Sequence, residues 1–225
     1  MTANTMTPDT ETSPTSPADV RTDPRPLFAR AVAIAEPVIA GVRLEQLDLP
    51  SPCVEYSVKE LLDHLVFVLH RVAALGRGDA AFGPKSTAGA RNDRDDWTTE
   101  WRAAASDMQS AWADDGVLDK MMVLPWATMT GAEVLSMYVS EITTHTWDLA
   151  TASGQQPAWD DAVCRLGLAA MHRDLPMADR TPMWEAFRAH APANMQFDPP
   201  FANAVAVPLD APLIDQLVAW TGRQP

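Results

Sequence analysis

The segment EITTHTWDLA (141–150) carries a carboxylate and an imidazole at a spacing that suits metal binding. Glu141 and His145 stand four residues apart, which places both side chains on one face of a helix, one turn from each other. Two ligands one turn apart can hold a single ion, as the two histidines of an HExxH motif do. Such a pair is more often a structural Glu–His pair than a metal site, and the spacing alone favours that interpretation.

A catalytic zinc site needs three protein ligands and an open position, so a third ligand would have to come from another helix. The remaining histidines are His64, His70, His172 and His190. His64 lies at the flank of an apolar stripe predicted for residues 58–76, which makes it a modestly better candidate than His70. His172 is predicted at a helix end, where histidine often serves as a C-terminal cation, and His190 lies in irregular sequence.

Asp148 follows one turn after His145 on the same flank of the predicted helix. It is therefore a candidate to orient the imidazole of a metal ligand without binding the metal itself. Alternatively, it caps a helix or forms an ion pair. The two cysteines, Cys53 and Cys164, lie far apart without a C-x-x-C motif, so a thiolate zinc site is not expected. Two isolated cysteines suit a reducing cytoplasm, where each is expected to be buried and unreactive; a single disulfide is the alternative.

Apolar residues recur at helical spacing along most of the chain. The predicted helices span 27–42, 58–76, 96–114, 130–152, 160–175 and 211–221, with a further short helix at 183–191. Ser57 and Glu60 form a capping box before the second helix, and Pro37 is expected to kink the first. These amphipathic helices, with almost no strand pattern between them, predict an all-α four-helix bundle with additional C-terminal helices.

Residues 119–131 are predicted as an extended connector that crosses over the bundle, because their short apolar run ends at Pro125. The connector carries four large side chains, Met121, Met122, Trp126 and Met129. These side chains either line a pocket at the site or fill the core, and the core interpretation is favoured because methionine commonly fills gaps in cores.

Charge and composition exclude several classes of function. The net charge is -13 and the sequence pI about 4.6, so the chain is expected to bind neither nucleic acid nor an anionic membrane surface. There is no run of eighteen apolar residues that could span a membrane and no secretory signal. Residues 1–24 are rich in Thr, Pro, Ser and Asp and are predicted as a disordered tail, which leaves residues 25–225 for the helical bundle.

Three stretches in order along the chain are similar to a known family. They are SPCVEYSVKELLDHL (51–65), EITTHTWDLATASGQ (141–155) and PLDAPLIDQLVAWTGRQP (208–225). They resemble the DinB-like superfamily, specifically the actinobacterial metal-binding proteins related to mycothiol-dependent maleylpyruvate isomerase. The resemblance covers residues 27–225 and implies a DinB-like bundle that holds a divalent metal, usually zinc, through His64, Glu141 and His145. It thereby selects His64 over His70.

The resemblance also implies a chemistry. A metal-bound thiolate of mycothiol would attack an electrophilic small-molecule substrate, as in a thiol S-transferase or an isomerase. Two imidazoles and a carboxylate would also suit nickel, iron or manganese. The alternatives are a non-catalytic metal- or ligand-binding module and a metal-dependent hydrolase that uses water in place of the thiol. Bundles of this type often pair through helix faces, so both a monomer and a homodimer stay open.

Overall fold

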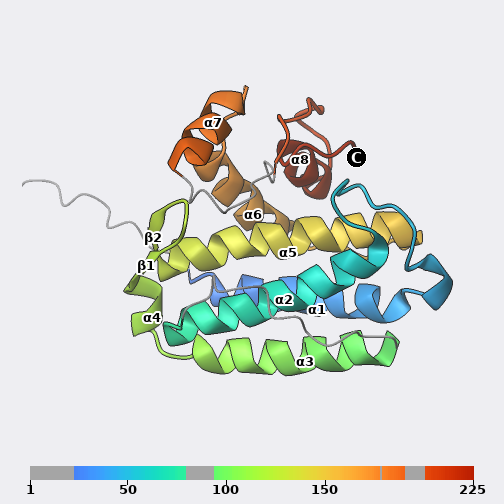
Figure 1. The fold of residues 1–225 in the computed structure, drawn as a ribbon, viewed down its shortest axis with the longest axis horizontal. Coiled ribbons are helices and arrows are strands. Elements are labelled where there is room, and N and C mark those ends of the chain that lie inside the picture. Colours follow the sequence, from blue (N-terminus) through green and yellow to red (C-terminus); the bar gives the residue numbers. More distant parts are fainter. Residues whose placement is uncertain (1–22, 80–93, 178, 191–200) are drawn as a thin grey trace, which may run out of the picture.

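Helix α5 is the centre of the fold and packs against other helices on two sides (Figure 1). The structure is a computed structural model that describes residues 23–79, 94–177, 179–190 and 201–225, without the side chains of 94–96 and 190. On one side, α5 completes a four-helix bundle made by α1 (Arg25–Gly41), α2 (Val58–Arg77), α3 (Arg94–Ala111) and α5 (Gly131–Ser153). On the other side lie α6 (Asp161–Asp174), α7 (Thr181–His190) and α8 (Leu213–Trp220).

The predicted all-α bundle with additional C-terminal helices is confirmed, and each predicted helix is present with ends that differ by less than one turn. Each bundle helix packs chiefly against two neighbours, in the order α1, α3, α2, α5 around the bundle. The capping box before α2 is also present, since the Ser57 backbone nitrogen donates to Glu60 Oε2 at 2.8 Å and the Glu60 nitrogen donates to Ser57 Oγ. Pro37 lies inside α1, which continues to Gly41.

Tryptophan side chains fasten α3 to the bundle. The large buried apolar side chains of this segment are Trp97, Trp101 and Met108 in the helix and Trp112 directly after it. The indole nitrogen of Trp101 donates to the carbonyl of Val32 in α1, and that of Trp112 donates to the carbonyl of Val72 in α2. Because each buried N–H finds a backbone acceptor, the indoles contribute apolar area without leaving a donor unsatisfied.

Helix α5 is buried on most of its surface although it carries many hydroxyl side chains. Thr143, Thr146 and Ser153 donate to carbonyls four residues earlier in the same helix. These local bonds satisfy the hydroxyls, so the small side chains allow close packing in the middle of the protein. Helix α6 lies so close that a Cβ atom at Gly167 would stand 3.1 Å from Ser140 Cα, which accounts for a glycine at that position.

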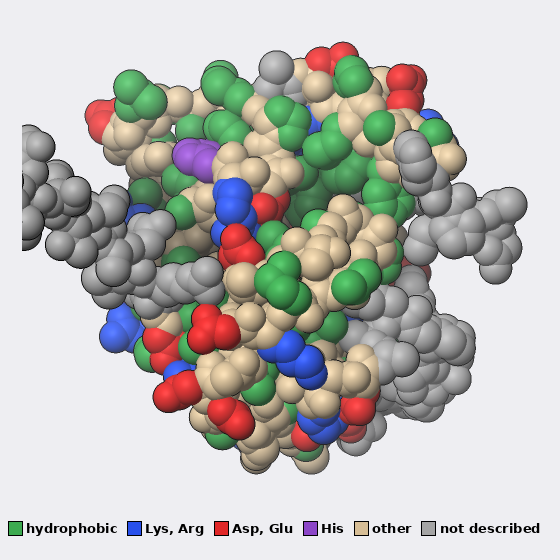
Figure 2. Space-filling view, turned by 90° about the vertical axis from the view of Figure 1, so that its left-hand side faces the viewer, with side chains coloured by type: hydrophobic (Ala, Val, Ile, Leu, Met, Phe, Trp, Pro, Cys, Tyr) green, Lys and Arg blue, Asp and Glu red, His purple; other side chains and the backbone are tan. Residues whose placement is uncertain are grey.

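The connector between α3 and α5 differs in part from its prediction. It crosses the end of the bundle, as expected, but it does so through a short helix and a hairpin: α4 (Gly116–Asp119), β1 (Met121–Val123) and β2 (Thr128–Thr130). Met122 and Met129 pair across the hairpin and are buried, whereas Met121 and Trp126 are exposed. The hairpin lies at the left-hand end of the molecule in Figure 1, which faces the viewer in Figure 2. Only alternate residues of each strand enter the core, because successive side chains of a strand point to opposite faces.

The hairpin lies away from the residues proposed to do chemistry. It joins α5 at Gly131, and Glu141 follows about 15 Å further along the helix axis at 1.5 Å per residue. The connector therefore contributes to the core and to the surface at this end, and it does not line the site.

Several predictions concern residues that the structure does not describe. Residues 1–22 of the predicted tail are among these, so the division into a tail over 1–24 and a bundle over 25–225 stays a prediction. Within the described part of the chain, no helix combines the length and the apolar character needed to cross a membrane.

The capping box gives a first prediction. We expect Ser57→Ala to lower the free energy of unfolding by about 1 kcal/mol, because the backbone N–H of Glu60 loses its acceptor at the start of α2. Urea denaturation would measure the change. Ser110→Ala removes a hydroxyl from an exposed position in α3 and should stay within about 0.5 kcal/mol of the wild type. Equal losses in the two variants would contradict the capping role.

Candidate metal centre

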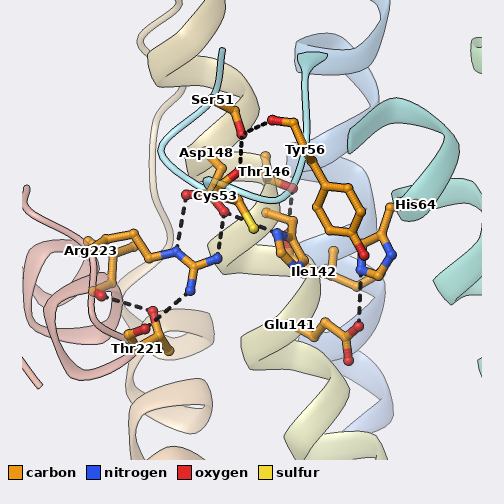
Figure 3. Close-up of polar contacts among 12 residues, drawn as sticks. Ser51, Cys53, Tyr56, His64, Glu141, Ile142, Thr146, Asp148, Thr221 and Arg223 are labelled. Atoms are coloured by element: carbon orange, nitrogen blue, oxygen red, sulfur yellow. Dashed lines mark hydrogen bonds and ion pairs between the residues drawn. The ribbon is translucent and has the colours of Figure 1, made fainter. Parts of the chain in front are cut away.

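The structure brings His64, Glu141 and His145 together across the contact between α2 and α5 (Figure 3). His64 lies in the second turn of α2, and the other two residues lie one turn apart in the middle of α5. One ligand atom from each of the three side chains lies within 4.8 Å of the others. The ring centroids of His64 and His145 are 4.8 Å apart, with the rings nearly perpendicular.

The geometry of this group fits a bound cation. His64 Nε2 lies 3.4 Å from Glu141 Oε1, and two ligands of one tetrahedral zinc ion lie about 3.3 Å apart. His64 Nε2 is buried and has no hydrogen-bond partner in the described structure. The side chains of His64, Glu141 and His145 retain 15%, 22% and 12% exposure, so the group stays within reach of solvent.

Burial lowers the pKa of the His64 imidazole, against the opposing effect of the Glu141 carboxylate. His64 is therefore favoured in the neutral form. Because a metal binds imidazole only in that form, the ring is ready to serve as a ligand without first losing a proton.

The buried carboxylate of Asp148 fixes the orientation of the His145 imidazole. Asp148 Oδ2 lies 3.0 Å from His145 Nδ1, and Asp148 is completely buried. An ionised carboxylate can only accept, so the proton lies on Nδ1 of His145 and the lone pair on Nε2 is left for a ligand. This is the contact that the sequence predicts for an Asp148 that orients a ligand imidazole.

Asp148 is paired in turn with Arg223, near the C-terminus of the chain (Figure 3). The guanidinium donates from Nε to Oδ1 at 3.2 Å and from Nη2 to Oδ2 at 2.9 Å, and a third donor reaches the carbonyl of Thr221. Burial raises the pKa of Asp148, but the bond to His145 and the charge of Arg223 outweigh it and hold the pKa below its usual range. Asp148 is therefore ionised and its charge is balanced within the site.

The backbone at the end of α8 turns so that the Arg223 side chain reaches Asp148. Gly222 has a φ of +93°, and the backbone nitrogen of Arg223 donates to the carbonyl of Val218 at 3.0 Å. These are the features of a left-handed helix end, which turns the chain back on itself. A Cβ atom at Gly222 would also stand 2.8 Å from the Cβ of Ala202, so glycine is required twice over.

A second group of side chains has metal-ligand types but does not suit a cation. Cys53, His145 and Asp148 also bring one ligand atom each within 4.8 Å of one another. Here, however, both oxygens of Asp148 accept bonds from the Arg223 guanidinium, whose charge would repel an ion. Burial also raises the pKa of the Cys53 thiol and disfavours the thiolate that a metal needs. The group around His64 is therefore the better site.

Tyr56 covers the His64 side of the group. Its ring stacks on the His64 imidazole with centroids 4.9 Å apart and an angle of 26° between the planes. Burial raises the pKa of Tyr56 to about 12, and the nearby acidic groups of Glu55, Cys53 and Glu141 add to the shift. The phenol is thus neutral at physiological pH.

The other histidines lie elsewhere. His70 is exposed, and its Nε2 lies 3.0 Å from Glu100 Oε1, which is a surface pair between α2 and α3. His172 lies in the last turn of α6 and its ring contacts Trp220, with centroids 4.1 Å apart. The side chain of His190 is outside the described residues.

Sequence reasoning did not identify Arg223, Tyr56 or the position of Cys53 beside His145. All three residues fall within the stretches that carry the family resemblance, over 51–65 and 208–225. Their place in those stretches was the available signal, because the residue types alone do not show which side chains they contact. Cys53 and Cys164 are both free; Cys164 is buried, as expected, whereas Cys53 is only partly buried.

Comparison with known proteins places the site in a family context. The family model described as the mycothiol maleylpyruvate isomerase N-terminal domain matches residues 28–150, which include His64, Glu141 and His145. Two uncharacterized proteins from two strains of Mycobacterium tuberculosis, MT0763 and Rv0738, are each 28% identical over 205 residues, or 89% of this chain and 98% of theirs. No solved structure gives a significant match.

The buried pair of Asp148 and Arg223 gives a prediction about stability. Arg223→Met should lower the free energy of unfolding by about 3–5 kcal/mol, because it leaves a buried carboxylate without its cation. In the double variant Arg223→Met with Asp148→Asn, no buried charge is left unpaired, so much of the loss should be recovered. Chemical denaturation of the four proteins of this cycle would measure the coupling. Strictly additive losses would contradict it.

The lowered pKa of Asp148 predicts a dependence on pH. Because its folded pKa lies below the unfolded value of about 3.9, the unfolded chain binds the proton more tightly. The stability that this group contributes is therefore complete above that value and is lost as the pH falls through the folded pKa. Asp148→Asn should show a shallower loss of stability below about pH 4 than the wild type. An equally steep loss of stability below pH 4 in both proteins would contradict the lowered pKa of Asp148.

Proposed function

Because the chain belongs to the mycothiol maleylpyruvate isomerase N-terminal domain family, we propose that it binds a divalent metal ion, zinc, through His64, Glu141 and His145. The observation that carries the proposal is the buried Nε2 atom of His64, which makes no hydrogen bond of good geometry within the described part of the chain and lies 3.4 Å from Glu141 Oε1, beside the His145 ring. A buried polar atom without a partner costs about 1–3 kcal/mol, and a cation between these ligands would remove that cost.

The same residues support a thiol as the substrate that enters the site. Two neutral imidazoles and one carboxylate leave a bound divalent ion with residual positive charge, which favours the thiolate form of a thiol. Asp148 keeps the proton of His145 on Nδ1, so that the lone pair of Nε2 is free to bind the metal. We infer that the thiol is mycothiol, in line with the family, and that the protein acts in the cytoplasm as a thiol S-transferase or isomerase on an electrophilic small molecule.

The two reactions differ in the fate of one bond. In a transfer by substitution, the sulfur forms a bond to an electrophilic carbon while the bond from that carbon to a leaving group breaks. In a transfer by addition, the sulfur bonds to one carbon of a double bond and the neighbouring carbon takes up the proton that the thiol lost. In an isomerisation, the sulfur adds to a double bond in the same way, the substrate rotates about the resulting single bond, and the carbon–sulfur bond then breaks, which restores the double bond and releases the thiol unchanged. The partial exposure of the three side chains fits both, because each reaction needs space for two molecules at once.

Metal content is the direct test of the site. We expect about one zinc ion per chain in the untagged wild type and almost none in His64→Ala, measured by inductively coupled plasma mass spectrometry. His70→Ala is the matched control, since it removes an exposed histidine from the same helix and should keep the metal. Wild-type protein that stays free of metal after reconstitution would overturn the proposal.

Thiol binding separates an enzyme from a metal-binding module. Mycothiol should raise the melting temperature of the zinc form and leave that of the metal-free form unchanged, because a ligand stabilises only the state that binds it. At about 100 times its dissociation constant the stabilisation would be about 2.7 kcal/mol. Equal shifts in both forms would place the thiol away from His64 and Glu141, and hydrolysis of activated esters without thiol would indicate the hydrolase alternative.

A further inference from the structure

The loop before α2 holds one aromatic side chain over the candidate site. It spans residues 49–57, and Figure 3 shows it passing above the histidines. The hydroxyl of Ser51 donates to the carbonyls of Cys53 at 2.9 Å and Tyr56 at 2.7 Å. The backbone nitrogen of Tyr56 donates to the carbonyl of Cys53, also at 2.9 Å. The loop is therefore tied to itself by hydrogen bonds, and Tyr56 is fixed before any ligand arrives.

The position of the Tyr56 hydroxyl indicates a role in addition to packing. Its ring lies over the His64 imidazole, with a second contact to His145 at 6.3 Å between centroids. In Figure 3 the hydroxyl end of Tyr56 is directed toward the side of His64 on which Glu141 lies. A phenylalanine would stack on His64 equally well, so stacking does not explain why position 56 carries a hydroxyl directed toward Glu141.

We propose that Tyr56 is a ligand-binding residue of this centre, whose hydroxyl donates a hydrogen bond to the sulfur or oxygen atom of the molecule bound beside His64 and Glu141. This inference rests on the proposed function, because it requires a metal ion and a ligand at that place. The donor faces a position where negative charge gathers when a thiol binds. Hydrogen bonds to a charged acceptor are about twice as strong as neutral ones, so the contact would add to affinity.

The experiment uses full-length protein loaded with cobalt(II), whose visible absorption reports both the metal and the exchange of its ligands. Each protein is titrated first with cobalt and then with 2-mercaptoethanol. Tyr56→Phe should bind cobalt as the wild type does and bind the thiol about tenfold more weakly. The matched control is Tyr138→Phe, which removes the hydroxyl of the only other tyrosine, a fully buried side chain of α5. It should change thiol affinity by less than about twofold.

Each outcome decides a different question. Equal thiol affinity in Tyr56→Phe and wild type, with normal cobalt binding, overturns the role of Tyr56 and leaves the metal site intact. Loss of cobalt from Tyr56→Phe also overturns it, since the side chain would then act by holding His64. An equal loss of thiol affinity in Tyr138→Phe does so too. A wild type that binds no cobalt removes the proposed metal site together with this inference. A wild type that binds cobalt without responding to the thiol keeps the metal site and removes the thiol chemistry together with this inference.

Discussion

One buried carboxylate joins the parts of this protein. Asp148 lies in the central helix α5, accepts the Nδ1 proton of His145 and receives two hydrogen bonds from Arg223. It thereby connects the four-helix bundle, the candidate metal centre and the segment that follows α8. Its burial would be costly alone, but the guanidinium balances its charge and the three donors occupy both of its oxygens. The orientation of His145 thus depends on Asp148 and, through it, on Arg223, which lies 75 positions after Asp148 in the chain.

This dependence explains which features the sequence could predict. The helices follow from apolar spacing, and the start of α2 follows from Ser57 and Glu60, because these signals are local. The pairing of Glu141 with His145 is local for the same reason. The choice of His64 over His70 was not local; it came from the family resemblance, and the structure places His64 in the group and His70 on the surface.

The features that escaped prediction share a physical cause. The hairpin of β1 and β2 has three residues in each strand, which is too short for an alternating pattern to stand out from a loop. Arg223 and Tyr56 act through contacts made in space between distant segments, and their spacing along the chain says nothing about them. The spacing of apolar residues predicted the broad class of the fold, whereas the site depends on how α2, α5 and the segment after α8 pack together.

The charge of the protein bears on the form in which a thiol would reach the proposed site. With a net charge of -13, the protein repels anions, and at physiological ionic strength the charges within about 8 Å of a ligand contribute most of that repulsion. Asp148 and Arg223 cancel each other, and Glu141 is the one carboxylate among the three proposed ligands. A ligand that arrives as a neutral thiol and loses its proton only on binding avoids the repulsion that a preformed thiolate would meet. The same negative field favours the entry of a cation, so the overall charge and the local ligand set act in the same direction.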